Sequence, residues 1–193
     1  FADLQDCFSP VNFVHKDSTS TAVRQTHNFS FCRGGNISFN SVQFTGSSLN
    51  NKLVYLVLKN RGFLFSLNLD IRRFYNQIAV SRRISSFQKF YWPRDGILGQ
   101  GELVVVVALV LLFGSVHSQC IANLCKLKTS QMFTDDKEVQ DTVADMYTDD
   151  CMCQSNVNIK ECWTLAQKVI DTLSLGGFTF KTPVPSHHWD PGG

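Results

Sequence analysis

The stretch 63-FLFSLNLDI-71 decides the fold, because its side chains alternate strictly between two faces. One face carries only Phe and Leu. The other carries Leu64, Ser66, Asn68 and Asp70. Alternation with period two is typical of a half-buried β-strand. We therefore predict a strand with one face packed on a core and with Asp70 near its end, on the more polar face.

A pair of adjacent aspartates, Asp149 and Asp150, follows Tyr147 and Thr148. Residues 143–147 and 151–153 both favour strand, and acidic pairs are depleted in strands, so the pair is expected at the tip of a β-hairpin. Two carboxylates about 4 Å apart repel by about 4 kcal/mol at an effective dielectric near 20. A hard divalent cation offsets this repulsion, and Mg²⁺ is typically held by one or two carboxylates plus substrate phosphates. The alternative is a solvated turn, which is what most such pairs are.

The remaining pattern interleaves helices with strands. Helical spacing is found in residues 49–60, 114–129 (entered through Gly114 and Ser118), 137–141 or beyond, and 158–175. Asn158 is expected to cap the last helix, and Gly176-Gly177 to end it. Short strands are expected in residues 1–50, 86–92 and 178–181, with a hairpin turn at residues 94–96. This order predicts an α+β domain with helices packed on one face of a sheet.

Charge is distributed unevenly along the 193 residues, although the net charge is only +2. Residues 71–94 hold six basic side chains before the first acid, whereas residues 135–161 hold eight acids. A basic segment suits a polyanion and an acidic one suits a cation. Two oppositely charged, solvated faces are the alternative.

The cysteine pattern argues against a zinc site and a disulfide framework, and the length of the apolar run argues against a membrane-spanning helix. There are 7 Cys, an odd number, and no two C-x₂-C units at zinc spacing, which favours a reduced, intracellular protein. The apolar run from Leu103 to Phe113 is shorter than the roughly 20 residues of a membrane-spanning helix, and its valines favour a buried core strand. Because the sequence starts without Met and ends in Asp-Pro-Gly-Gly, it is expected to be a piece of a longer protein.

Three motifs carry a resemblance to a known family. They are 68-NLDIRRFYNQI-78, 147-YTDD-150 and 176-GGFTFK-181, the last placed after a helix. Together they resemble the catalytic motifs of reverse transcriptases, and their particular residues are similar to those of the BEL/Pao group of LTR retrotransposons. The similarity covers roughly residues 10–186, and Phe113-Gly114 followed by Ser118 supports it. The aspartate box alone is a weak signal, whereas the three motifs in this order are specific.

The resemblance implies a polymerase palm-like antiparallel sheet with helices packed on one face, plus partial fingers. Residues 1–66 would be the partial fingers, residues 67–186 the palm and residues 187–193 a tail. It also implies RNA-directed DNA polymerase activity, in which two Mg²⁺ ions (Mn²⁺ is possible) clamp the attacking 3′-oxygen and the leaving pyrophosphate. Asp70 and Asp149 would bridge the ions. Asp150 would assist at longer range or orient the hairpin.

The resemblance assigns substrate contacts to further residues. Tyr75 would lie under the sugar and exclude a 2′-hydroxyl, with a core aromatic as the alternative. The other assigned positions are the carbonyl of Ile71 (metal), Gly114 and Ser118 (template and nucleotide), Phe113 (packing at the base), Lys181 (pyrophosphate, or simply solvated) and Arg24 (triphosphate).

The sequence departs from the BEL/Pao pattern at Asn28, Ser47 and Gln119, and residues 99–112 are unusually aliphatic. None of these changes removes a metal ligand. The implied partners are a template-primer, deoxynucleoside triphosphates and the thumb, RNase H and integrase domains of a polyprotein, in a cytoplasmic particle and without a membrane. Two alternatives stay open. One is an inactive remnant that binds nucleic acid, and the other is an RNA-dependent RNA polymerase palm, against which Tyr75 argues.

Overall fold

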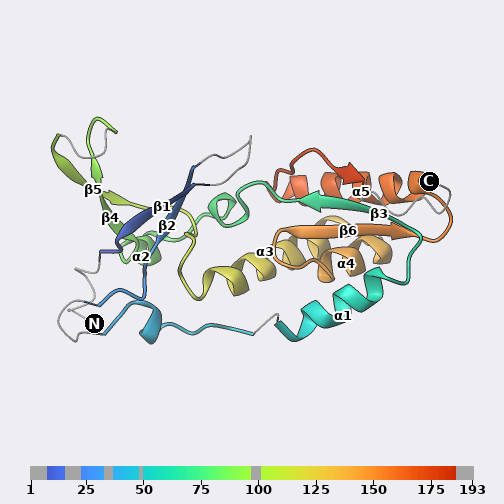
Figure 1. Ribbon diagram of the computed structural model, residues 1–193, viewed down its shortest axis with the longest axis horizontal. Helices are drawn as coiled ribbons and strands as arrows, with labels where there is room; N and C mark the ends of the chain where they lie inside the picture. The colour runs from blue at the N-terminus through green and yellow to red at the C-terminus, as the bar shows by residue number, and fades with distance from the viewer. Residues whose placement is uncertain (1–7, 16–22, 33–36, 48–49, 97–100, 186–193) are drawn as a thin grey trace. The chain divides into compact units, whose positions relative to one another are not determined.

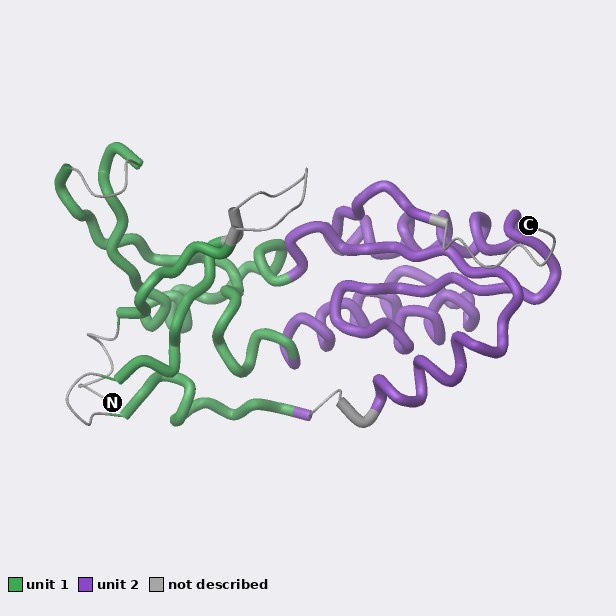
Figure 2. Tube along the Cα trace, viewed as in Figure 1, with its two compact units in different colours: residues 1–46, 75–119 green, residues 47–74, 120–193 purple. Residues whose placement is uncertain are grey.

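The computed structural model describes residues 8–15, 23–32, 37–47, 50–96 and 101–185. Helices and small antiparallel sheets make up the chain, so the predicted α+β class is confirmed (Figure 1). The chain forms two compact units: unit 1 contains residues 1–46 and 75–119, and unit 2 contains residues 47–74 and 120–193 (Figure 2). The chain passes from one unit to the other three times. The division into fingers and palm expected after residue 66 stays a prediction.

The centre of unit 2 is a three-stranded antiparallel sheet with the order β6-β3-β7. Its strands are β3 (Phe65–Asp70), β6 (Asp150–Ser155) and β7 (Val184–Pro185). The register pairs Phe65 with Ser155 and continues to Asp70 opposite Asp150. Leu67 and Leu69 on β3 are fully buried. The strand predicted from the alternating stretch is therefore confirmed, with Asp70 as its last residue.

Helices cover the buried face of this sheet. They are α3 (Ser118–Phe133), α4 (Lys137–Ala144) and α5 (Ile159–Leu175), and Figure 1 shows them behind β3 and β6. Helix α5 packs on both strands, and α4 packs on α5 and β6. The buried positions of α5 are Cys162, Leu165, Ala166, Val169, Thr172 and Leu173. These positions recur every three or four residues, as on one face of a helix, so the predicted helix is confirmed.

The ends of α5 also agree with the prediction. The Asn158 side chain accepts a hydrogen bond from the N–H of Glu161, 3.0 Å away, which satisfies one of the free amides of the first turn. At the other end the N–H of Gly176 donates to Leu173, and Gly177 has φ +88°. A glycine adopts this left-handed conformation at little cost, so it ends the helix.

Two strand predictions in unit 2 are wrong. Residues 143–147 do not form a strand, because Val139 and Val143 are buried on one side of α4, whose first turn is capped by the Asp136 side chain. The aspartate pair therefore lies in a turn between a helix and β6, closed by one bridge between Tyr147 and Asp150. Residues 178–181 make only a single bridge, from Phe180 to Ile71.

Helix α1 (Asn50–Asn60) agrees with the predicted helix at residues 49–60, but little of its apolar surface is covered. Leu56 is buried, whereas Leu53 and Val57 are exposed. Polar contacts hold the helix instead: Lys59 forms an ion pair with Asp145 at 2.5 Å, and Lys52 donates to the carbonyl of Ala144. Among the described residues, no helix combines the length and apolar character needed to cross a bilayer.

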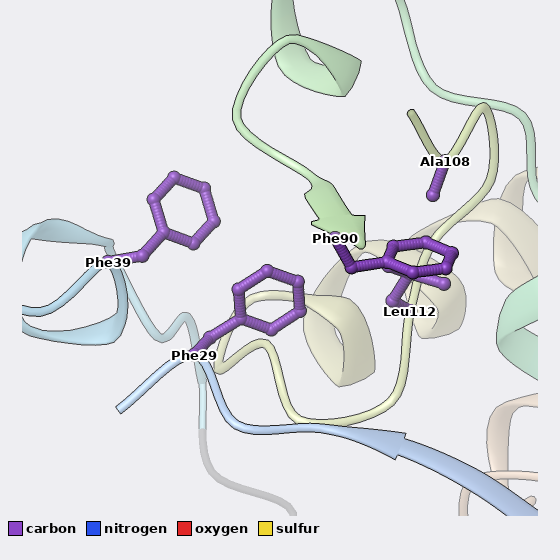
Figure 3. Close-up of a cluster of buried hydrophobic side chains, with 5 residues drawn as sticks. All are labelled: Phe29, Phe39, Phe90, Ala108 and Leu112. Carbon is purple, nitrogen blue, oxygen red and sulfur yellow. The ribbon is translucent and has the colours of Figure 1, made fainter. Parts of the chain in front are cut away.

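Unit 1 is built from two antiparallel strand pairs. The strands are β1 (Val11–His15) with β2 (Val23–His27), and β4 (Lys89–Pro93) with β5 (Leu103–Val107). Short helical segments connect them: η2 (Asn40–Val42), η3 (Phe74–Gln77) and α2 (Arg82–Ser85). Their core contains Phe29, Phe39, Phe90, Ala108 and Leu112 (Figure 3). The strands expected in residues 1–50 and 86–92 and the turn at residues 94–96 are thus confirmed, the turn by a Gly96 N–H bond to Pro93.

The apolar run from Leu103 to Phe113 is only partly a core segment, which corrects the prediction. Along β5 the outward side chains Leu103, Val105 and Val107 are exposed, and in the rest of the run Ala108, Leu111 and Leu112 are buried whereas Leu109 is exposed. The reason is that β5 belongs to a two-stranded pair, of which only one face is covered by the rest of unit 1.

Removing a buried side chain from β3 should destabilise unit 2. We expect Leu67→Ala to lower the free energy of unfolding by about 2–5 kcal/mol, because the side chain is fully buried and its loss leaves a cavity. Leu64→Ala is the matched control, since Leu64 is 68% exposed, and should cost less than about 0.5 kcal/mol. Urea denaturation followed by circular dichroism measures both, and equal effects would contradict the assigned faces of β3.

Candidate active site

The aspartates meet at one end of the sheet in unit 2. Asp70 ends β3 and Asp150 begins β6, and the two are direct cross-strand partners. Directly opposite residues in antiparallel strands have Cα atoms about 4.5–5.5 Å apart, with side chains on the same face. The N–H of Ile71 donates to the carbonyl of Asp149, 3.0 Å away. This bond ties the turn that carries the pair to the end of β3.

Three negative charges act on one another here. The pKa of Asp150 is raised, first by partial burial and then by the charges of Asp149 and Asp70. Lys181 and a hydrogen bond from Asn68 act in the opposite direction. A raised carboxyl pKa means that the folded chain resists the third negative charge. Partial burial and the two neighbouring carboxylates therefore all disfavour the charged form of Asp150.

One cation of the protein already lies in this cluster. The ammonium of Lys181 is 2.7 Å from Oδ2 of Asp70, and the backbone N–H of Lys181 donates to the carbonyl of Asp70 at 2.9 Å. The other carboxylate oxygen, Oδ1 of Asp70, is buried and has no hydrogen-bond partner among the described residues. A buried carboxylate oxygen without a partner is costly, so it is the position at which a further cation would be stabilised best.

The turn that carries Asp149 has a strained backbone at Thr148, and a hydrogen bond from Lys126 holds it. Thr148 has φ +52°, a conformation that is unfavourable for a β-branched residue. Its hydroxyl donates to Oδ1 of Asp149 at 2.7 Å, and its carbonyl accepts a hydrogen bond from Lys126 at 2.7 Å. Lys126 was missed by the sequence analysis. The structure places it four residues after the buried Ala122, on the buried side of α3.

A cavity of about 680 Å³ adjoins Asp150, between α1, α4 and β6. Its apolar part is lined by Leu53, Leu56 and Met152. Its polar part includes the acids Glu138, Asp141, Asp145 and Asp150. Because four acids and one base, Lys59, line it, the cavity favours cations over phosphate groups.

The described residues offer a pair of carboxylates to a metal ion but not a full set of protein ligands. No group of three His, Cys, Asp or Glu side chains within them is arranged to hold a metal ion. Asp70 and Asp150 lie opposite each other, and this suits Mg²⁺, which needs one or two carboxylates and completes its shell with water and substrate phosphates. The bridging pair expected from the sequence was Asp70 with Asp149. The register makes Asp150 the direct partner of Asp70.

The other predicted site residues belong to unit 1. Tyr75 packs edge-on against Phe113, with ring centroids 4.6 Å apart. The Ser118 hydroxyl donates to the carbonyl of Leu112 at 2.8 Å. Arg24 lies on β2 opposite Val14, and its side chain is outside the described part of the structure. The structure thus brings Tyr75 and Phe113 together, and it gives Ser118 a local structural role.

The structure shows why position 114 requires a glycine. It has φ +99°, and a Cβ built on it would lie 1.9 Å from the carbonyl oxygen of His27. Its own carbonyl accepts a hydrogen bond from Asn40 at 2.8 Å. Only glycine allows the two backbones to approach so closely.

No family model matches the chain, and no curated protein matches it. The resemblance to reverse transcriptases therefore rests on the three sequence motifs and stays a prediction.

Because the pKa of Asp150 is raised, we predict that removing its charge stabilises the fold by an amount that depends on pH. The folded chain binds the Asp150 proton more tightly than the unfolded chain, so this residue destabilises the fold as the pH rises through its folded-state pKa. Asp150→Asn should raise the free energy of unfolding at pH 7 by up to about 1 kcal/mol, because partial exposure screens the repulsion. At pH 3, where the carboxyl is protonated in both states, the gain should vanish. Denaturation at the two pH values measures this, and a larger gain at pH 3 would contradict it.

Replacing Gly114 should disturb unit 1. Gly114→Ala places a methyl group against the His27 carbonyl and should cost about 2–4 kcal/mol of unfolding free energy. Gly96→Ala is the matched control, because Gly96 also has a positive φ of +77° but has open space around it, and should cost about 1 kcal/mol. Thermal unfolding of both variants compares them. Equal losses would show that the close approach to His27 is unimportant.

Proposed function

We propose that the chain is a fragment of an RNA-directed DNA polymerase that adds deoxynucleotides to the 3′ end of a primer. The observation that carries the proposal is the register of β3 and β6, which sets Asp70 directly opposite Asp150. The N–H of Ile71 donates a hydrogen bond to the backbone carbonyl of Asp149, so the residue that carries the third carboxylate is held at the same end of the sheet. The three motifs that resemble those of BEL/Pao reverse transcriptases support the same reaction.

In this proposal Asp70, Asp149 and Asp150 hold two Mg²⁺ ions, with the carbonyl of Ile71 as a further ligand. When bound, these ions would act as Lewis acids on the attacking 3′-oxygen and the leaving pyrophosphate. Lys181 is paired with Asp70 in the structure. Its ammonium, released from Asp70, would be free to neutralise the pyrophosphate, which is the role that the resemblance gives it.

The resemblance assigns contacts to the nucleotide and the template to further residues. Tyr75 would exclude the 2′-hydroxyl by the bulk of its ring. Phe113, Gly114, Ser118 and Arg24 would line the path of the template and of the triphosphate. The exposed Arg72, Arg73, Arg82 and Arg83 would bind the phosphate backbone, with an affinity that falls as salt rises. The remaining domains of a retrotransposon polyprotein would be partners in a cytoplasmic particle.

One observation favours a second candidate, a catalytically inactive retrotransposon remnant that binds nucleic acid. Lys181 already neutralises Asp70, and the described carboxylates do not form a group of three metal ligands. The exposed basic side chains Arg82 and Arg83 would bind nucleic acid in either case.

Primer extension separates the two candidates. The 193-residue chain, with oligo(dT) annealed to poly(rA), should incorporate dTTP in the presence of Mg²⁺ or Mn²⁺. Asp70→Asn and Asp149→Asn should each lower the rate at least about a hundredfold, because the stabilisation that bound metals give to the developing charge is worth several kcal/mol. Asp135→Asn is the matched control, since Asp135 is an exposed acid away from the cluster, and should leave the rate unchanged.

Two results would contradict the proposed activity. One is extension that does not respond to the Asp70 and Asp149 substitutions. The other is the absence of extension with both metals, by this chain and by the longer protein that contains it, while salt-dependent binding of the primer-template persists, a result that would favour the remnant.

A further inference from the structure

Lys126 is the most unusual charged residue in unit 2. It lies on α3, only 2% of it is exposed, and its ammonium points beneath the turn that carries the aspartate pair. The ammonium donates to the carbonyl of Thr148 at 2.7 Å and to that of Met146 at 3.4 Å. It also lies 5.5 Å from the centroid of the Phe74 ring. Met146 and Thr148 lie just before Asp149 and Asp150, and Phe74 lies four residues after Asp70.

Burying this ammonium is expensive. Burial lowers the pKa of Lys126 to about 7, and the nearby charge of Asp149 acts in the opposite direction. A buried charge is weak evidence for stability, because a well-packed apolar side chain of similar size is often as good or better. Its presence therefore calls for a reason other than packing.

The backbone above Lys126 supplies that reason. Thr148 is held at φ +52°, and such strain costs about 1–3 kcal/mol unless the surroundings enforce it. The Lys126 hydrogen bond to the carbonyl of Thr148 fixes the peptide that follows the strained residue, which is the one leading into Asp149. On the other side, Ile71 binds the carbonyl of Asp149. The two bonds clamp the turn between α3 and the end of β3.

We propose that Lys126 is a positioning residue, which enforces the strained turn at Thr148 and thereby sets where Asp149 and Asp150 stand relative to Asp70. The clamp on the turn follows from the contacts alone. Its purpose, spacing carboxylates for cations, rests on the proposed function. Lys126 touches no substrate in this role, because both of its hydrogen bonds go to backbone carbonyls.

Hydrogen exchange tests the clamp without reference to activity. In the full 193-residue chain, Lys126→Met keeps the length of the side chain and removes the ammonium. The amides of Asp150 and Ile71, which donate to Tyr147 and Asp149, should then exchange at least about tenfold faster, the effect expected when a hydrogen bond to a charged group is lost. Lys128→Met is the matched control, because Lys128 is exposed on the same helix, and should leave both amides unchanged. Unchanged exchange of both amides in Lys126→Met would overturn the proposal.

Mn²⁺ binding tests the purpose of the clamp. If Lys126 only added a positive charge, its removal would strengthen Mn²⁺ binding. If it positions the carboxylates, Lys126→Met should weaken binding about tenfold or more, while Lys128→Met leaves it unchanged. Stronger or unchanged binding in Lys126→Met would overturn the positioning role. Absence of Mn²⁺ binding by the unsubstituted chain would instead count against the proposed function, and the exchange experiment would still decide on the clamp.

A second variant covers the case in which Lys126→Met does not fold. Thr148→Gly removes the cost of the positive φ, because glycine adopts it freely. In the Lys126→Met background it should restore folding and most of the protection of the Asp150 amide. A double variant that stays unfolded would show that Lys126 supports the core rather than the turn, and would overturn the proposal.

Discussion

The register between β3 and β6 is the constraint on which the rest of unit 2 depends. Side chains alternate along a strand, so a slip of one residue would exchange the two faces of β3. In the observed register Leu67 and Leu69 face Cys153 and Cys151, and all four are fully buried. The same register places Asp70 opposite Asp150. Burial of the apolar face therefore fixes the meeting of the carboxylates, and α5 stabilises both at once by packing on the two strands.

Charge balance at that end of the sheet comes from two lysines of different character. Lys181 is exposed and pairs with a side chain, so it can leave Asp70 at little cost. Lys126 is buried and binds backbone carbonyls, so it cannot leave without exposing unpaired groups. One lysine is thus an exchangeable counter-ion and the other a fixed part of the turn. An incoming cation would compete with Lys181 for Asp70 and would leave Lys126 in place.

The parts predicted from sequence are those whose signals are local. Residues 65–70 alternate strictly, and α5 has a cap, an apolar stripe and a glycine stop, so both were predicted correctly. Val143 was taken for strand because a short apolar run fits either period, and its burial four residues after Val139 decided for a helix. Lys126 could not be interpreted without the fold, because a lysine on a helix is normally solvated. Only the α3 packing beneath Thr148 reveals that this one is buried.

Several energetic costs in unit 2 meet at the turn between α4 and β6. Burial and then the neighbouring carboxylates raise the pKa of Asp150, Thr148 is strained, and Lys126 is desolvated, whereas the neighbouring strands and α5 follow their local preferences. Proteins that violate local rules tend to do so at functional sites, since packing alone would remove each violation. An Ala-rich or Gly-containing turn over an apolar side chain would close the same connection between α4 and β6 more cheaply. That the sequence instead places two adjacent acids, a strained threonine and a buried lysine together is the physical reason to regard this turn as a site.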